Sequence, residues 1–236
     1  MKKFVKALAA IMLMTMAMFT TGCNKDNDDG DGTVNGHDYV DLGLPSGTLW
    51  ATCNVGATTP EGYGDYFAWG ETQPKNYYDW STYQYCNGTS WDDPQLTKYC
   101  SKSSYGYNGF TDNLTILLPE DDAATANWGN GWRMPTYDNW VELRQNTTMT
   151  WVTQNGVQGR LFTASNGNSL FLPAAGYRDS SSLDTAGRLG YYWSSSLNTD
   201  YPYNARLLYF TSGYYDMGNF GRDCGQSVRP VRSGQN

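Results

Sequence analysis

The amino-acid sequence predicts an α+β fold that is β-rich, with two short helices and long loops. Three observations support this prediction. Glycine, tyrosine and tryptophan are abundant, at 26, 19 and 9 residues, while charged residues make up only 17% of the 236 residues. This mixture suits strands and turns better than a helical bundle. No long segment of the sequence keeps an apolar helical period, and short extended runs alternate with turn residues.

The N-terminal residues have the features of a bacterial lipoprotein leader. Residues 1–22 begin with lysines and continue with an apolar run that is too short to span a membrane. The run ends in Thr20-Thr21-Gly22-Cys23, which resembles the lipoprotein cleavage box, although that box usually has leucine where Thr20 stands. The resemblance predicts a signal peptide over residues 1–22 and lipidation of Cys23. Several acyl chains would then anchor the mature chain stably in a membrane.

The next stretch, residues 23–36, is expected to be an acidic tether that follows the lipidated cysteine. It is rich in Asn, Asp and Gly, which favours a solvated linker. Its spacing partly imitates a calcium loop, but such a loop needs a preceding helix and a glutamate where Asp38 stands. We therefore assign no metal ligands there. Acidic residues after a lipidated cysteine also resemble the surface-export signal of Bacteroidetes lipoproteins, which implies the cell outer membrane, facing the extracellular side.

A single domain is expected over residues 37–236. Its first strands are predicted at residues 39–42 and 49–53, separated by the turn Pro45-Ser46-Gly47. The Tyr/Ser/Asn-rich stretch near 77–107 is expected to be an elaborated surface insertion.

The cysteines of the domain lie in an expected compartment where disulfides persist. Cys86 and Cys100 bracket a short polar stretch of the insertion. A disulfide between Cys86 and Cys100 is expected, because closing so short a loop stabilises a fold by about 3 kcal/mol. The pairing of Cys53 and Cys224 is left open.

Both predicted helices follow prolines. One covers residues 119–126, where acidic residues suit the positive end of a helix, and the other follows Pro135 with Thr136 as its N-cap. The later strands include a hairpin, residues 160–164 and 169–172, around Asn166-Gly167-Asn168. The remaining strands are predicted at residues 191–194, 205–210, 214–217 and 227–231.

Charge and histidine content exclude several functions. The net charge of −7 and the lack of a basic stripe in the sequence argue against nucleic-acid binding. Any catalytic triad or imidazole metal site would depend on His37, the single histidine. We therefore expect no enzyme activity and no cofactor.

Several ordered stretches resemble a known family, the Fibrobacter succinogenes major paralogous domain family of gut Bacteroidetes lipoproteins. The stretches are residues 40–56, 64–71, 131–136, 171–178, 190–195 and 225–231. The resemblance implies a C-type-lectin-like fold, as in formylglycine-generating enzymes and in target proteins of diversity-generating retroelements. It implies the fold more firmly than the activity, because the molecular function of the family is largely undefined.

Residues 198–223 carry Tyr, Asn, Asp, Arg and Gly around an apolar strand, the chemistry of antibody paratopes. Retroelement targets carry such a mixture at this place, so the chain is a possible diversification target, with Cys224 as a product. Alternatively, Tyr and Asn simply decorate loops and strand edges. The candidate ligand-binding residues are Asn198, Asp200, Tyr201, Tyr203, Asn204, Arg206, Tyr214, Tyr215, Asp216, Met217, Asn219, Phe220, Arg222 and Asp223.

The expected function is recognition of an extracellular protein or glycan by a surface-displayed lipoprotein. The alternatives are a structural or fimbria-like subunit, and a cryptic enzyme of the formylglycine-generating type. Motif arginines and tryptophans are expected to belong to the scaffold and the core. These are Arg133, Arg178, Arg229, Trp50, Trp69, Trp132 and Trp193.

Overall fold

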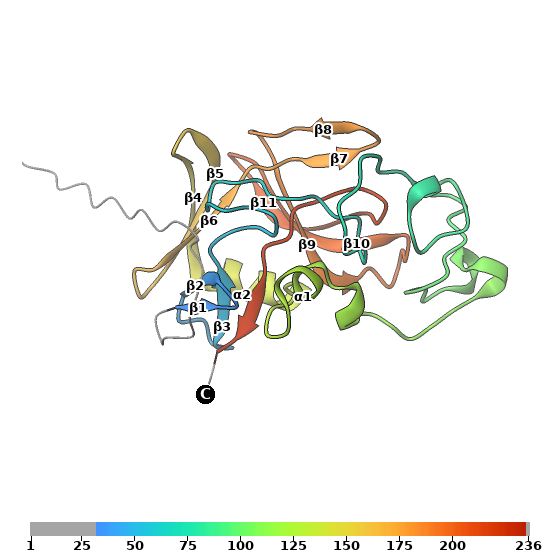
Figure 1. The fold of residues 1–236 in the computed structure, drawn as a ribbon, viewed down its shortest axis with the longest axis horizontal. Coiled ribbons are helices and arrows are strands. Elements are labelled where there is room, and N and C mark those ends of the chain that lie inside the picture. The colour runs from blue at the N-terminus through green and yellow to red at the C-terminus, as the bar shows by residue number, and fades with distance from the viewer. Residues whose placement is uncertain (1–31, 235–236) are drawn as a thin grey trace, which may run out of the picture.

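The computed structural model describes residues 32–234. The predicted signal peptide, the lipidation site Cys23 and residues 23–31 of the predicted acidic tether lie outside the described residues. The described part is β-rich and its sheets are antiparallel, as the sequence predicted (Figure 1). No helix within residues 32–234 is long and apolar enough to cross a membrane.

One sheet joins the two ends of the described chain. Its strand order is β1 (Thr33–Val34), β2 (His37–Asp41), β3 (Thr48–Ala51) and β12 (Val231–Ser233). The last strand pairs with β3, with Val231 opposite Trp50. The predicted strand at 227–231 therefore begins later than expected. The residues before it form isolated bridges instead, among them Ser227 with Tyr192.

A second sheet is a three-stranded meander of β4 (Thr147–Gln154), β5 (Val157–Ala164) and β6 (Ser169–Pro173). The predicted hairpin of β5 and β6 is confirmed. Strand β4 was not predicted, although the Asn155-Gly156 turn that joins it to β5 is a strong hairpin signal. Both turn residues have positive φ, 48° and 84°, as a tight primed turn requires.

A third sheet has the order β9 (Gly190–Leu197), β10 (Asn204–Phe210) and β11 (Tyr215–Gly221), close to the prediction. A short ribbon of β7 (Tyr177–Asp179) and β8 (Ser182–Asp184) lies beside it.

Both predicted helices are confirmed. A 3-10 turn, η4 (Pro119–Asp121), leads into α1 (Ala123–Trp128), and Asp122 caps α1 by accepting hydrogen bonds from the backbone N–H of Ala124 and Thr125. Helix α2 (Tyr137–Asn146) begins with Thr136 as its N-cap, in a capping box with Asn139.

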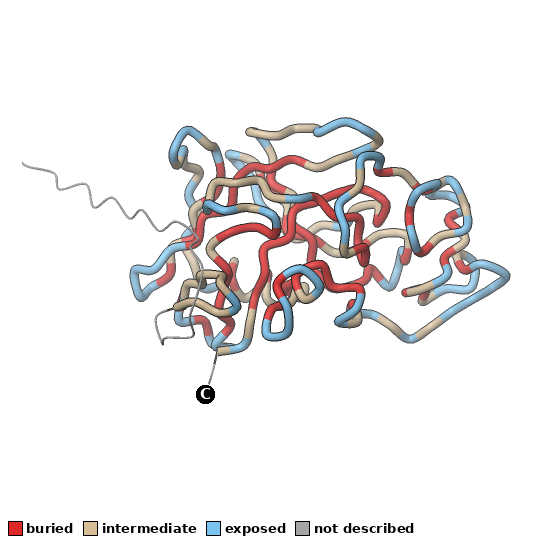
Figure 2. Tube along the Cα trace, in the orientation of Figure 1, coloured by how far each residue is buried: buried red, intermediate tan, exposed pale blue. Residues whose placement is uncertain are grey.

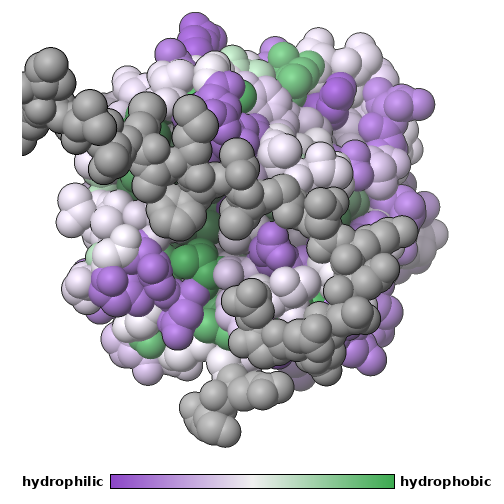
Figure 3. Space-filling model, turned by 60° about the vertical axis from the view of Figure 1, so that its left-hand side comes forward, coloured by the Kyte–Doolittle hydropathy of each residue, from purple (hydrophilic) through white to green (hydrophobic). Residues whose placement is uncertain are grey.

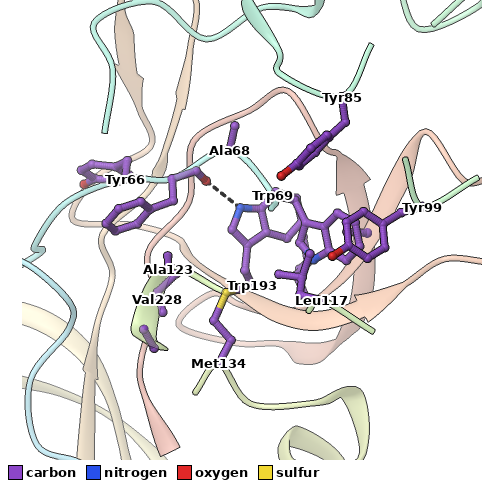
Figure 4. Packing of buried hydrophobic residues seen from close by; sticks show 14 of the residues in the cluster. Tyr66, Ala68, Trp69, Tyr85, Tyr99, Leu117, Ala123, Met134, Trp193 and Val228 are labelled. Carbon is purple, nitrogen blue, oxygen red and sulfur yellow. Dashed lines mark hydrogen bonds between the residues drawn. The ribbon is translucent and has the colours of Figure 1, made fainter. Parts of the chain in front are cut away.

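Two hydrophobic clusters form the core. The first surrounds Trp69 and Trp193, with Tyr85 and Tyr99 beside Trp69 (Figure 4). The second lies between α2 and the sheets, around Trp50, Trp140 and Phe162. The tryptophans predicted to be core, Trp50, Trp69, Trp132 and Trp193, are all fully buried, as expected.

The motif arginines also serve the scaffold. Arg229 is fully buried and donates hydrogen bonds to Asn54 Oδ1 and to the carbonyls of Ala51 and Thr52. Arg178 lies over the ring of Tyr66, and Arg133 donates to the side chain of Asn139.

The stretch 77–107 is irregular, but it is more than a surface insertion. It contains the 3-10 turns η1 (Trp80–Thr82) and η2 (Ser103–Tyr105), and η3 (Tyr107–Gly109) ends just beyond it. Its side chains enter the first core cluster, and the burial trace shows buried stretches here among exposed ones (Figure 2). The buried residues of the stretch that belong to this cluster are Tyr78, Trp80, Tyr83, Tyr85, Leu96, Tyr99 and Cys100.

The predicted Cys86–Cys100 disulfide is wrong, because both thiols are free. The Cys86 Sγ donates to the carbonyls of Trp80 and Gly88, at 2.9 and 3.1 Å, and the Cys100 Sγ donates to Lys102 O at 3.1 Å. The loop thus gives each thiol its own backbone acceptor. Loop length predicted the pairing, but it carries no information on where each side chain points.

Candidate functional site

The β9–β11 sheet holds much of the predicted ligand-binding set. Strand β10 pairs with β11 along its whole length, from Asn204 opposite Gly221 to Phe210 opposite Tyr215. Successive residues of a strand point to opposite faces, so the predicted residues on these strands are divided between two faces.

One face carries aromatic rings at the surface. We call Tyr177, Tyr191, Tyr209, Tyr214 and Phe220 the aromatic face. Tyr191 lies 5.1, 5.2 and 5.7 Å, between ring centroids, from Tyr177, Tyr209 and Phe220, and Tyr214 extends the group from Tyr209 at 6.1 Å. The first three rings and Phe220 are half-buried, and Tyr214 is 53% exposed.

The aromatic face is chemically suited to contact another molecule. Its rings are held on paired strands and offer large contact areas with few rotatable bonds. Burial, and then the neighbouring Tyr209, raise the pKa of Tyr191 to about 12, so its hydroxyl stays neutral and can donate a hydrogen bond. The hydroxyl of Tyr214 donates to Asp216 Oδ2 at 2.9 Å and so orients a carboxylate at the edge of the face.

The opposite face of the sheet packs against helix α2. The guanidinium of Arg144 of α2 lies over the ring of Tyr215 on this face. It also forms a 3.0 Å salt bridge with Asp216, which is opposite Tyr209 in the ladder and so belongs to the aromatic face. Arg206 lies over Tyr137, the first residue of α2, and Met217 packs against the second core cluster. These predicted residues therefore support the sheet.

Asn204 and Asn219 lie on the same face of the sheet as Arg206 and Met217. The Asn204 Nδ2 donates to Asn219 Oδ1 at 2.8 Å across the β10–β11 ladder.

Tyr201 and Tyr203 join a separate cluster with the 77–107 stretch. We call Trp91, Tyr105, Tyr201 and Tyr203 the Trp91 group. Tyr203 lies 6.2, 5.1 and 5.9 Å from the rings of Trp91, Tyr105 and Tyr201. Trp91 and Tyr201 are 63% and 51% exposed.

The loop between β9 and β10, which carries Tyr201 and Tyr203, is hydrogen-bonded to the 77–107 stretch. Lys102 Nζ donates to the carbonyl oxygen of Asp200 at 2.6 Å and lies over the ring of Tyr201.

Three of the predicted ligand contacts are buried, so the structure does not place them where a ligand reaches them. Asn198 caps its own loop, because its Oδ1 accepts from the backbone N–H of Asp200 and Tyr201. Arg222 is 0% exposed and stacks on Trp69 and Tyr83. Asp223 is also buried. A paratope-like composition does not show whether a polar side chain faces solvent or forms hydrogen bonds with buried groups of the protein.

Arg222 connects the C-terminal region to the 77–107 stretch. Its Nε donates to the Tyr83 hydroxyl at 2.8 Å, and its Nη atoms donate to the carbonyls of Lys98, Tyr99 and Pro202. A guanidinium has several N–H donors in one plane, so a single arginine side chain can form all of these hydrogen bonds in the core.

Asp223 and Cys224 form a desolvated acidic pair. Burial, and then the neighbouring carboxylates Asp179 and Asp79, raise the pKa of the Asp223 carboxyl to about 7. Burial also raises the pKa of the Cys224 thiol, with Asp223 adding to the effect, so the thiol stays protonated at neutral pH. Because Cys224 is buried, it does not belong to an exposed recognition surface.

His37 and the acidic residues around α1 have structural partners. The His37 ring stacks on Trp128 at 3.6 Å, and burial lowers its pKa, which keeps it neutral. Asp121 accepts from the hydroxyls of Tyr85 and Tyr99 and from Lys98. Within residues 32–234 no group of His, Cys, Asp or Glu has an arrangement that holds a metal ion.

Sequence reasoning missed three residues of the aromatic face, Tyr177, Tyr191 and Tyr209. The alternation of Ala205, Leu207 and Tyr209 along a predicted strand was a usable signal for Tyr209. No sequence signal placed Tyr177 beside Tyr191, because their strands meet only in the folded chain. Comparisons of the chain with protein-family models, curated proteins and solved structures return no match.

Proposed function

We propose that this chain is a non-enzymatic surface lipoprotein, anchored through Cys23 at the cell outer membrane, that recognises an extracellular protein or glycan. The aromatic face is the observation that carries the proposal. Half-exposed rings on a rigid ladder present contact area at low entropic cost, which is how recognition surfaces gain affinity.

We further propose that the domain has the C-type-lectin-like fold of the Fibrobacter succinogenes major paralogous domain family. The antiparallel sheets, the two short helices and the pairing of β3 with β12 at the ends of the domain support this proposal.

The surface composition is compatible with a protein that faces an aqueous exterior. The side of the molecule that faces left in Figure 1 is mostly hydrophilic or neutral where it is visible, with small hydrophobic patches (Figure 3).

The test is a binding screen of the chain from residue 23, with Cys23→Ser so that it is purified without lipid. The screen uses an array of glycans and gut-surface proteins. We expect a ligand that is lost in the Tyr214→Ala/Phe220→Ala variant and retained in the Trp91→Ala/Tyr201→Ala variant. Both pairs remove two surface rings, so the second is a matched control for lost area.

Loss of binding only in the Trp91→Ala/Tyr201→Ala variant would move recognition to the Trp91 group. An array without any bound ligand would remove the support for a recognition function.

A further inference from the structure

A pocket opens between the β4–β5 hairpin and the loop 211–214 that follows β10. Its volume is about 500 Å³, within the usual range of small-molecule sites, about 300–1,000 Å³. The lining comes from three separate parts of the chain: the hairpin, the turn before β9 and the loop after β10. The lining residues are Trp151, Gln158, Arg188, Leu189, Thr211 and Ser212.

One rim of the pocket is held by a buried arginine. Arg160 is directly opposite Trp151 in the β4–β5 ladder, and its Nε and Nη2 donate to Thr211 O at 3.0 and 2.8 Å. The loop 211–214 is also stabilised by internal hydrogen bonds, because Thr211 Oγ1 accepts from the backbone N–H of Gly213 and Tyr214. The pocket is therefore formed before any ligand arrives, which lowers the entropic cost of binding.

The lining suits a ligand with an apolar ring face and a polar rim. Trp151 is half-buried, and its ring is fixed edge-on against Phe210 at 6.4 Å. Around the ring lie the amide of Gln158 and the hydroxyls of Thr211 and Ser212, which both donate and accept hydrogen bonds. A sugar ring has this character, since its C–H face packs on an indole while its hydroxyls bond to polar side chains.

The charge of the pocket selects among sugars. Arg188 contributes a positive charge, and the lining contains no acidic residue to balance it. Across residues 32–234, no carboxylate lies within salt-bridge distance of its guanidinium. Arg188 is exposed, and its guanidinium can bind one carboxylate with two parallel hydrogen bonds.

We propose that this pocket binds a saccharide that carries a carboxylate, a uronic or sialic acid residue. Trp151 contacts the ring face, Arg188 pairs with the carboxylate, and Gln158, Thr211 and Ser212 bond to the hydroxyls. The site is separate from the aromatic face and does not depend on it.

The test measures binding by calorimetry to the Cys23→Ser chain from residue 23. The probes are trigalacturonic acid with its methyl ester, and sialyllactose with lactose, so that each pair differs in the carboxylate. We expect at least one acid to bind about tenfold more tightly than its neutral partner, which corresponds to about 1.4 kcal/mol. Arg188→Gln is expected to abolish that difference, while Lys102→Gln, an equal charge change at an exposed residue outside the pocket, preserves it.

A second variant addresses the ring contact. Trp151→Phe keeps an aromatic ring in the fold but reduces the contact area, and it is expected to weaken the acid and the neutral sugar by similar factors. The Phe220→Ala variant, which removes a ring of the aromatic face, is expected to bind the acid as tightly as the parent chain. The proposal is overturned by equal binding of the acid and neutral probes, by binding that Arg188→Gln leaves unchanged, or by no binding of any probe at about 10 mM.

Discussion

The β9–β11 sheet and the 77–107 stretch are both rich in tyrosine, yet they use it in opposite ways. In the sheet, Tyr191 and Tyr209 are half-exposed, with their rings packed against each other at the surface. In the stretch, Tyr85 and Tyr99 are buried, and their hydroxyls donate to the carboxylate of Asp121. Tyrosine thus forms part of an exposed surface in one region, and in the other it belongs to a buried hydrogen-bond network.

Irregular backbone in the interior needs polar side chains that bond to its N–H and C=O groups. Strands satisfy their backbone groups by pairing, so their side chains remain available for other contacts. The 77–107 stretch has little regular structure, and Arg222 therefore bonds to its carbonyls at Lys98 and Tyr99. A Tyr-rich, Asn-rich composition is compatible with either arrangement.

The largest expected effect comes from removing the hydrogen bonds by which Arg222 connects the two regions. Arg222→Met removes the donors to the Tyr83 hydroxyl and to three carbonyls, and leaves these groups buried without them. We expect a loss of about 3–5 kcal/mol in the free energy of unfolding, measured with denaturant. Arg206→Met is the control: Arg206 is half-exposed on the face of the sheet toward α2, and its loss should cost less than about 1 kcal/mol. Similar losses for both variants would show that Arg222 does not join the regions.

The next largest effect concerns the pH dependence of stability that comes from the buried carboxyl of Asp223. The pKa of Asp223 in the folded state, about 7, lies above the ordinary aspartate value of 3.8, so the folded state holds a proton that the unfolded state releases between these two pH values. The contribution of this group to stability is therefore greatest below about pH 4, and it falls by about 2–4 kcal/mol as the pH rises to about 7.

Asp223→Asn removes this contribution to the pH dependence. The variant should melt at a higher temperature than the parent chain at pH 8, with little difference at pH 4. Thermal melts across this range check the prediction, and parallel curves for the two proteins would contradict it.

A paired substitution tests the contrast between the two kinds of tyrosine. Tyr99→Phe removes a buried hydroxyl that donates to Asp121 and accepts from the backbone N–H of Leu118, and should cost about 1–3 kcal/mol. Tyr214→Phe removes an exposed hydroxyl and should cost less than about 0.5 kcal/mol. Denaturant unfolding of both variants measures the difference. Equal costs would mean that the two regions do not differ in this respect.

The smallest effect is expected at the cysteines of the 77–107 stretch. Cys86→Ser replaces a free thiol with another donor, so stability should change by less than about 1 kcal/mol, with or without reductant. Loss of a native disulfide would instead cost about 2–5 kcal/mol. Melting curves of the variant under both conditions separate the two results.

Local signals in the sequence predicted the regular elements well. The Thr136 cap, the Asn166-Gly167-Asn168 hairpin and the strand at 205–210 each depend on a few neighbouring residues, and each is present. Strand β4 had an equally local signal in Asn155-Gly156, which was overlooked. The predicted binding set was less accurate, because it treated residues 198–223 as one surface although the pleat and the buried groups divide it.

Sequence patterns alone were enough to predict the β-rich class, the two helices and the tryptophan core, because these follow from propensity, capping and hydrophobicity along short stretches. The exposure of each tyrosine, the internal position of Arg222 and the backbone acceptors of the Cys86 and Cys100 thiols became apparent only in the folded chain. The tertiary structure also brought Trp151 and Arg188 to one pocket from separate parts of the chain. The physical reason is that burial and side-chain partners depend on residues far apart in sequence, whose positions are fixed only when the sheets pack together.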